Sequence, residues 1–195
     1  VLRQLVGGSL DSLSVDSKSL DVTSKGQGGA TVTLSDVDVD LSRIRLRSPY
    51  PTDTVTASGT VGWKQVIALA ARDHPRMQGM TLQAKRTGTS AQEPGAIQAS
   101  ASLLGMSGEA EIVPSVGDDG SLVLTITSTR MGGDPVGGDV STGESSLLSY
   151  VGLDSPEIRI PADSLPQGLR PTSAIVTNDG LRLSLAGNQV NLGQL

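Results

Sequence analysis

Apolar residues recur at every second position along residues 30–47, with two breaks in the period. The alternating positions are Val32 and Leu34, then Val37, Val39 and Leu41, then Ile44 and Leu46. A period of two indicates a β-strand, and a step of three moves the apolar side chains to the other face unless a bulge absorbs one residue. At roughly 3.3 Å per residue, residues 30–47 would span about 60 Å if the strand were flat. The pattern therefore predicts a strand with bulges or bends near Ser35-Asp36 and Ser42-Arg43, within a strongly curved sheet.

The same period predicts further strands, most of them paired in hairpins. Alternating apolar positions occur within residues 10–22, 55–61, 80–84, 97–103, 110–112, 122–126, 158–160, 174–176 and 181–185. Asp118-Asp119-Gly120 and Asn178-Asp179-Gly180 have the composition of tight hairpin turns, and residues 25–29 form another glycine-rich turn. We therefore expect a mainly antiparallel sheet.

Helical spacing interrupts the strands in few places. Within residues 62–73 the apolar side chains of Trp63, Val66 and Ile67 share one helical face, and Pro75 ends the segment. A second short helix is predicted over residues 142–151, and residues 1–8 have the pattern of a final helical turn. We find no linker and no internal repeat, so residues 1–195 are expected to form one β-rich α+β domain with two or so helices.

The scarcity of aromatic residues constrains the interior of this domain. The chain has no Phe, one Trp and two Tyr, so short aliphatic side chains must build the core. Such an interior suits either thin sheet packing or a cavity with an apolar guest. Strand alternation and the helical face predict that one set of residues surrounds a shared apolar lumen: Val37, Val39, Leu41, Trp63, Val66, Ile67, Ile112, Leu124, Ile126, Val176, Leu183 and Leu185.

Charge and composition exclude several functional classes. The net charge is −5, which disfavours nucleic acid as a partner. Without cysteine the chain has no disulfide, thiol nucleophile or cysteine metal site. No apolar run approaches the roughly 20 residues that span a bilayer. The chain begins at Val1 without an initiator Met, and we expect it to be a fragment that lacks its original beginning.

The charged residues of the long strand have two interpretations each. Asp36, Asp38 and Asp40 alternate along a strand, whereas a calcium loop wraps its oxygens around one point, so a solvent-facing surface is the simpler interpretation. Arg43, Arg45 and Arg47 are interpreted as a solvated face or, alternatively, as contacts for anionic lipid head groups near a cavity mouth. Lys64 is a further head-group candidate.

Recognisable catalytic chemistry is missing from the sequence. His74, the single histidine, follows the end of a predicted helix, where the helix dipole favours a positively charged side chain. There is no Gly-x-Ser-x-Gly elbow and no Gly-x-x-x-x-Gly-Lys loop. We therefore expect a binding protein without catalytic residues, metal or cofactor.

Three segments together resemble the LmeA-type phospholipid-binding proteins of the actinobacterial cell envelope. The first runs from Gly8 to Val15, and the second is the hairpin from Gly108 to Ser128 through Asp118-Asp119-Gly120. The third and strongest is C-terminal: Leu165-Pro166-Gln167-Gly168-Leu169-Arg170, Thr172-Ser173-Ala174-Ile175-Val176-Thr177, Asp179-Gly180-Leu181 and Ala186-Gly187-Asn188-Gln189-Val190.

This resemblance implies both a fold and a function. The implied fold is a half-barrel like that of the tubular lipid-binding proteins, with helices closing an apolar lumen for acyl chains. The implied function is phospholipid binding outside the cytoplasm, in the cell envelope, by a periplasmic or membrane-anchored carrier or sensor that supports envelope lipid or lipoglycan maintenance. Compared with the family, we expect this sequence to lack the N-terminal helix, the anchor and the aromatic residue usual before the first strand.

Two other functions remain open at this point. One is a non-catalytic envelope scaffold that binds a protein partner through an exposed sheet edge, and the other is a hydrolase with an unusual site. Extractable lipid in the purified protein would distinguish the carrier from the scaffold.

Overall fold

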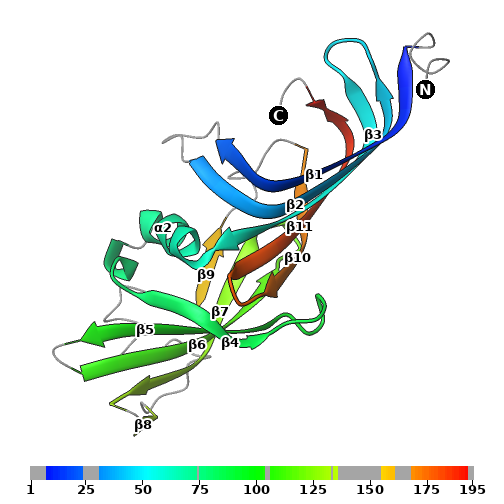
Figure 1. Ribbon diagram of the computed structural model, residues 1–195. Coiled ribbons are helices and arrows are strands. Elements are labelled where there is room, and N and C mark those ends of the chain that lie inside the picture. The colour runs from blue at the N-terminus through cyan, green and yellow to red at the C-terminus, as the bar shows by residue number, and fades with distance from the viewer. Residues whose placement is uncertain are drawn as a thin grey trace.

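The described part of the chain folds mostly into β-strands, which form two antiparallel sheets with one α-helix where they meet (Figure 1). The structure, a computed structural model, describes residues 8–23, 31–73, 75–103, 106–132, 134–135, 155–160 and 168–192. Residues 1–7 and 25–29, His74 and the helix predicted over 142–151 lie outside the described residues.

The first sheet has five strands and joins the two ends of the chain. Its strand order is β1-β2-β3-β11-β10, so the C-terminal strands lie beside the third strand. The bounds are Ser9–Thr23 for β1, Thr31–Arg45 for β2, Pro51–Gly62 for β3, Arg170–Val176 for β10 and Gly180–Asn191 for β11. The predicted hairpin through Asn178-Asp179-Gly180 is confirmed as the β10–β11 pair.

The second sheet is built from the middle of the chain. Its strand order is β4-β5-β6-β7-β8, and β9 pairs with β7. The bounds are Thr81–Thr87 for β4, Gly95–Leu103 for β5, Met106–Val116 for β6, Leu122–Met131 for β7, Asp134–Pro135 for β8 and Glu157–Ile160 for β9. The predicted hairpin through Asp118-Asp119-Gly120 is confirmed as the β6–β7 pair.

Helix α2 (Trp63–Asp73) and a short 3₁₀ helix (Pro75–Met77) connect the two sheets, and the predicted helix over 62–73 is confirmed. The prediction of a single sheet is wrong. In the folded protein β3 lies between β2 and β11, so both of its edges are paired within the first sheet. Strands β4 to β9 pair only among themselves and form the second sheet, whereas β10 and β11 return to the first sheet.

The two predicted breaks in the long strand are confirmed. Asp36 and Arg43 have positive φ angles of 48° and 49°, and the β2–β3 register shifts between Ser35 and Asp38. Strand β1 steps by three at the same two levels, so its register with β2 stays constant. The apolar residues of both strands therefore stay opposite one another: Leu10 with Ile44, Leu13 with Leu41, Val15 with Val39, and Leu20 with Leu34.

Both sheets and α2 contribute to one main core. Its buried residues come from β3, α2, the 3₁₀ helix, β5, β6, β7, β9, β10 and β11. Backbone hydrogen bonds also join the sheets: Gly88 N donates to Val176 O at 2.9 Å, and Val176 N donates to Pro94 O at 2.8 Å. The loop between β4 and β5 is thereby fixed to the end of β10.

Candidate functional site

The five-stranded sheet has one apolar and one polar face, and the cross-strand register makes both continuous. Val15, Val39, Ala57, Leu185 and Pro171 form an apolar row across all five strands. Side chains at alternate positions of a strand share a face, so the neighbouring rows lie on the same side: Leu13, Leu41, Val55 and Gly187, and Leu20, Leu34, Val61, Leu181 and Val176. We call this surface the apolar face.

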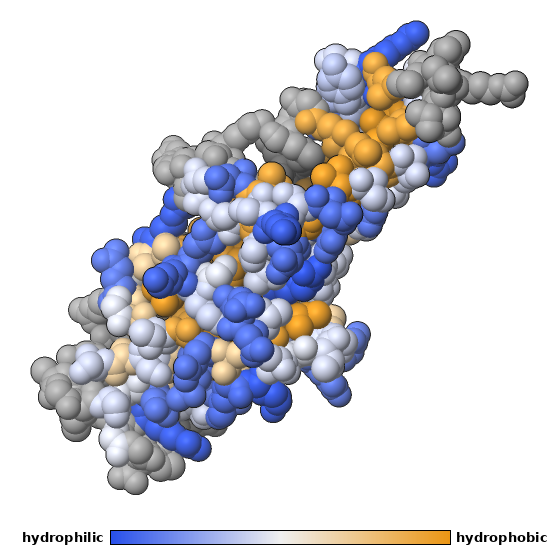
Figure 2. Space-filling view, viewed as in Figure 1, coloured by the Kyte–Doolittle hydropathy of each residue, from blue (hydrophilic) through white to orange (hydrophobic). Residues whose placement is uncertain are grey.

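The apolar face is covered at one end and open along β1. Val61, Leu181 and Val176 are buried in the main core. On β1, by contrast, Leu13 is 41%, Val15 45% and Leu20 43% exposed. Figure 2 shows hydrophobic surface in the upper part of the molecule, over this sheet. Contiguous exposed apolar residues on a protein surface indicate a binding site.

A second, smaller cluster lies at the open end of the apolar face. Val55, Leu169 and Val190 are buried in it. Four partly buried residues pack against these three: Val39, Leu41, Leu185 and Leu192. This distal cluster therefore packs aliphatic side chains together at the open end of the apolar face.

The polar face is held by charged and hydroxyl side chains. Arg182 Nη2 donates to Asp38 Oδ2 at 2.6 Å and to Ser58 Oγ at 2.7 Å, which ties β11 to β2 and β3. The Arg182 guanidinium, followed by the Ser58 hydroxyl, lowers the pKa of Asp38 from its ordinary value. Asp36, Asp38 and Asp40 are all exposed, as the solvent-face interpretation predicts. Among the described residues no group of three or more His, Cys, Asp or Glu could hold a metal ion.

The predicted lumen residues divide between these clusters, and none of the twelve falls in the exposed class. Val66, Ile112, Leu124, Ile126 and Val176 are part of the main core, and Trp63 and Leu183 pack against it. Val39, Leu41 and Leu185 pack against the distal cluster. Val37 is buried and Ile67 half-buried. That these residues line a space holding lipid stays a prediction.

Trp63 joins the end of β3 to the β10–β11 turn. Its indole Nε1 donates to the Asn178 carbonyl oxygen at 3.0 Å, and the ring packs against the main core. A partly buried indole with a satisfied N–H matches the expectation for a Trp at the edge of an apolar interior.

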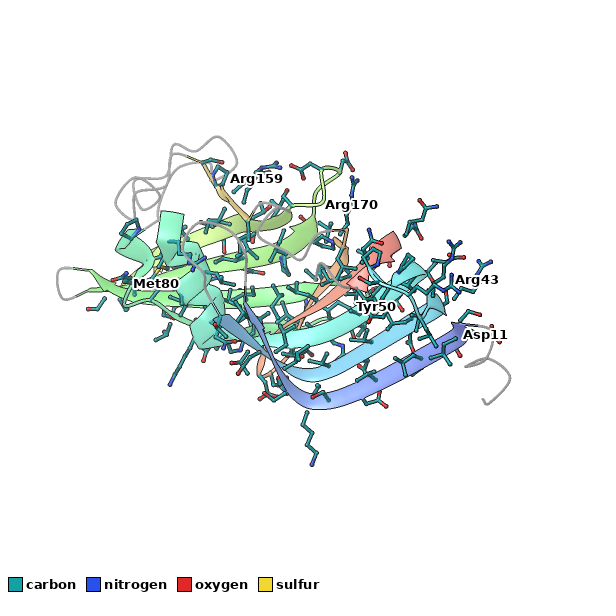
Figure 3. The ribbon with its side chains drawn as sticks, turned by 90° about the horizontal axis from the view of Figure 1, so that it is seen from above. Asp11, Arg43, Tyr50, Met80, Arg159 and Arg170 are labelled. Atoms are coloured by element: carbon teal, nitrogen blue, oxygen red, sulfur yellow. The ribbon has the colours of Figure 1, made fainter. Side chains whose placement is uncertain are left out.

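The four head-group candidates occupy two places rather than one. Arg43 forms an ion pair with Asp53, with 2.8 Å between Nε and Oδ2, and Arg45 and Arg47 are exposed nearby in sequence. Figure 3 shows Arg43 at the same end of the five-stranded sheet as Tyr50 and Asp11. Lys64 is exposed in α2, which begins at the opposite end of β3. The structure therefore groups the arginines and separates Lys64 from them.

Sequence reasoning missed the apolar residues of β1 as site residues. Leu13 alternates with Val15 and Leu20 with Val22, but alternation alone does not say which strand lies at a sheet edge. Two further exposed residues, Leu46 at 38% and Tyr50 at 46%, were also missed. The charged segment around Leu46 could have drawn attention to them.

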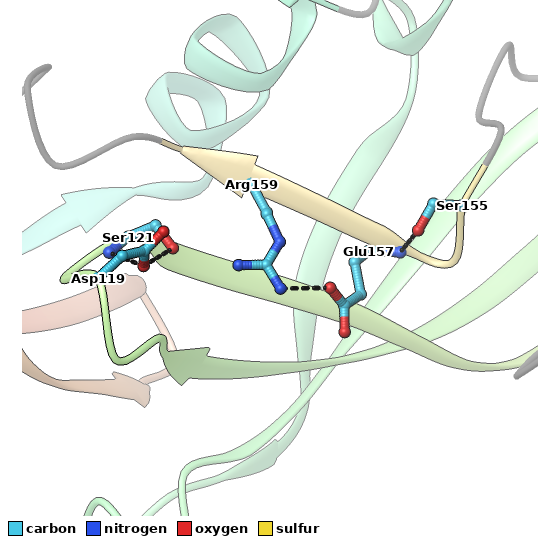
Figure 4. A network of polar contacts seen from close by, with 5 residues as sticks. All are labelled: Asp119, Ser121, Ser155, Glu157 and Arg159. Carbon is cyan, nitrogen blue, oxygen red and sulfur yellow. Dashed lines mark hydrogen bonds and ion pairs between the residues drawn. The ribbon is translucent and has the colours of Figure 1, made fainter.

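A separate group of polar contacts stabilises the second sheet (Figure 4). Asp119 Oδ1 accepts hydrogen bonds from Ser121 Oγ at 2.6 Å and from Ser121 N at 2.9 Å, which lowers the pKa of Asp119. On β9, Arg159 Nη2 and Glu157 Oε2 lie 2.8 Å apart, and Ser155 Oγ accepts a hydrogen bond from Glu157 N. These contacts hold the β6–β7 turn and the start of β9.

The fold and the apolar face define the protein as a β-sheet protein with a partly exposed aliphatic face. Residues 1–186 match a family described as LmeA-like phospholipid-binding. The chain therefore belongs to the LmeA-like phospholipid-binding family, as the resemblance noted above predicted. Comparisons with curated proteins and with solved structures gave no match. None of the helices that the structure describes is long and apolar enough to cross a membrane.

Proposed function

We propose that this protein binds phospholipid with the acyl chains on the apolar face, and that it is a lipid carrier or sensor of the cell envelope. Membership of a phospholipid-binding family supports lipid as the ligand. The observation that carries the placement is the continuous apolar face, with three aliphatic side chains of β1 more than 40% exposed. Envelope lipid or lipoglycan maintenance is the process that this carrier or sensor would support.

Aliphatic surface is sufficient to hold an acyl chain. Each buried CH₂ contributes roughly 0.8 kcal/mol, so a chain lying along β1 and β2 binds without a specific polar contact. The apolar face continues from exposed Leu13 and Val15 to buried Val61 and Val176. A tail on this face would replace water over its open part.

The shape that we propose is a half-barrel resembling the tubular lipid-binding proteins, with the apolar face inside. The positive φ angles at Asp36 and Arg43 support a bend of β2 at two levels. Matched steps in β1 allow both strands to bend together. The lumen residues predicted above would then extend the acyl-chain site towards α2.

Lipid retention tests this proposal directly. Native mass spectrometry of gently purified protein is expected to show bound phospholipid. Replacing exposed Val15 with Asp places a charge on the apolar face and is expected to abolish retention. Ser12→Asp is the matched control, because Ser12 is exposed on the same strand but lies on the polar face, opposite Ser42. Equal retention by both variants would place the acyl chains elsewhere.

An envelope scaffold is the second candidate, and the position of β1 favours it. Strand β1 lies at the edge of the five-stranded sheet, with β2 as its neighbour, and an open strand edge can pair with a partner strand. Protein that carries no lipid and ignores phospholipid vesicles, yet captures an extended peptide along β1, would support the scaffold over the carrier.

A further inference from the structure

The turn between β2 and β3 combines exposed basic and exposed apolar side chains. We call residues 43–51 the β2–β3 tip. Arg43, Arg45 and Arg47 are exposed there. Leu46 is 38% and Tyr50 46% exposed, and both belong to the few large apolar side chains that the described part of the chain shows to solvent. Amphipathic residues of this kind, with arginine beside Leu and Tyr, suit the boundary between lipid head groups and acyl chains.

Backbone hydrogen bonds fix the tip against the sheet. Leu46 N donates to Gly8 O at 2.9 Å, and Tyr50 N donates to Arg47 O at 2.8 Å. The Tyr50 carbonyl accepts from Leu192 N at 3.2 Å. Leu46 and Tyr50 are therefore presented on a held loop, which lowers the entropy lost when they are immobilised in a partner.

The charge of the tip is opposite to that of the whole chain. The chain carries 15 basic and 20 acidic residues, yet arginine occupies every second position from 43 to 47. Asp53 pairs with Arg43, whereas Arg45 and Arg47 form no ion pair with any residue that the structure describes. An anionic surface is attracted to this end of the molecule and repelled by the acidic remainder, which also sets the orientation of approach.

We infer that the β2–β3 tip docks the protein on a bilayer that contains anionic phospholipid, with Arg45 and Arg47 on the phosphates and Leu46 and Tyr50 at head-group depth. This inference rests on the proposed function and adds the element that meets the membrane. A bilayer is the occupant because an anionic phosphate layer over acyl chains matches both the arginines and the apolar residues.

The tip also lies where lipid would enter the apolar face. Leu192, whose N–H is bonded to Tyr50, packs against the distal cluster of Val55, Leu169 and Val190. Leu41 packs against the same cluster and pairs with exposed Leu13. A phospholipid that leaves the bilayer beside Tyr50 therefore meets a continuous aliphatic surface.

Vesicle flotation tests the docking role. The probes are vesicles of phosphatidylcholine with phosphatidylglycerol and vesicles of phosphatidylcholine alone, and the protein is the full chain. Replacing both Arg45 and Arg47 with Gln is expected to weaken binding to the anionic vesicles by roughly 30-fold. The native protein should itself lose binding as salt rises, because the screening length falls from about 10 Å at 0.1 M to about 3 Å at 1 M.

A second tip variant removes the apolar contacts without changing charge. Leu46→Ser combined with Tyr50→Asn is expected to weaken flotation by roughly tenfold; Asn tolerates the positive φ of 58° at position 50. The matched control is Arg86→Gln with Arg130→Gln, which removes the same charge from exposed positions of the second sheet. This control should float like the native protein.

Binding of a monomeric short-chain phospholipid separates this inference from the proposed function. Tip variants are expected to keep that binding in native mass spectrometry while they lose flotation. Native protein that fails to bind the short-chain lipid would overturn the proposed function. Native protein that binds it but does not float, or tip variants that float as well as the control variant, would overturn the docking role alone.

Discussion

Asp38 and Arg182 illustrate how single side chains support the polar face of the five-stranded sheet. Their ion pair, at 2.6 Å, connects strands far apart in the sequence, and Ser58 Oγ donates to the same carboxylate at 3.2 Å. Because these groups favour the ionised carboxylate, the pKa of Asp38 in the folded protein lies below its ordinary value. The stability that the pair contributes therefore depends on pH.

The sign of that dependence gives the first prediction. The folded state binds fewer protons than the unfolded state near the ordinary Asp pKa of about 3.9. The contribution of Asp38 is thus complete above that pKa and is lost as pH falls through the lowered pKa. Asp38→Asn should unfold at lower urea than the native protein near neutral pH, and this difference should shrink in acid. The pH-dependent difference should be smaller in an Arg182→Gln background, where Ser58 still donates to Asp38; an undiminished difference there would assign it to another partner.

Gly180 and Gly62 give a second prediction at single residues. They are register partners at the ends of β11 and β3. A Cβ at Gly180 would lie 2.0 Å from the Val61 carbonyl oxygen, whereas a Cβ at Gly62 would have its nearest neighbour, Asp179 O, at 3.9 Å. Gly180→Ala should therefore lower the free energy of unfolding by roughly 1–3 kcal/mol. Gly62→Ala should change it far less, and urea titrations that gave equal losses would contradict this packing.

Helix α2 depends on small residues to approach the sheets. Ala70 is 4% and Ala71 6% exposed, and both belong to the main core, as does Val66. Because the alanine side chain is short, the helix backbone can pack close to its neighbours. Alanine is also the residue with the highest helix propensity. The helix thereby closes the junction between the two sheets with few bulky side chains.

The third prediction compares two alanines of this helix. Ala70→Leu adds volume to a filled core and should reduce the free energy of unfolding by roughly 1–3 kcal/mol. Ala68→Leu adds the same atoms at an exposed position of α2 and should change it by about 0.5 kcal/mol or less. Thermal unfolding followed by circular dichroism measures both. A harmless Ala70→Leu would show that space remains around α2.

At the scale of the whole molecule, the two sheets share one core and are joined by backbone hydrogen bonds. The main core contains buried residues of both, and the β4–β5 loop is hydrogen-bonded to Val176 of β10. Trp63 lies at this junction, where it contacts the turn at Asn178 and the main core. Loss of either sheet would expose the core residues of the other.

The fourth prediction follows from this shared core. Urea unfolding monitored by Trp63 fluorescence, which reports the junction, and by far-UV circular dichroism, which reports both sheets, should give coincident transitions. Two separate transitions would show that the sheets are independent folding units. The single tryptophan of the chain makes the fluorescence signal specific to the junction.

Much of the local structure followed from the sequence because side-chain period reports secondary structure directly. The period of two predicted β2, β7, β10 and β11, and the steps of three located the breaks at Asp36 and Arg43. Turn composition predicted both confirmed hairpins, and helical spacing predicted α2. The C-terminal motifs were sufficient to indicate the family.

The tertiary structure decided which strands meet and what remains uncovered. The period of a strand does not identify its neighbours, so the division into two sheets and the edge position of β1 were not predictable from alternation. For the same reason Lys64 was grouped with arginines from which the length of β3 separates it. The exposure of Leu13, Val15 and Tyr50 likewise depends on long-range pairing. The sequence determined which residues are apolar on each strand, and pairing between distant strands determined which of them form one continuous face.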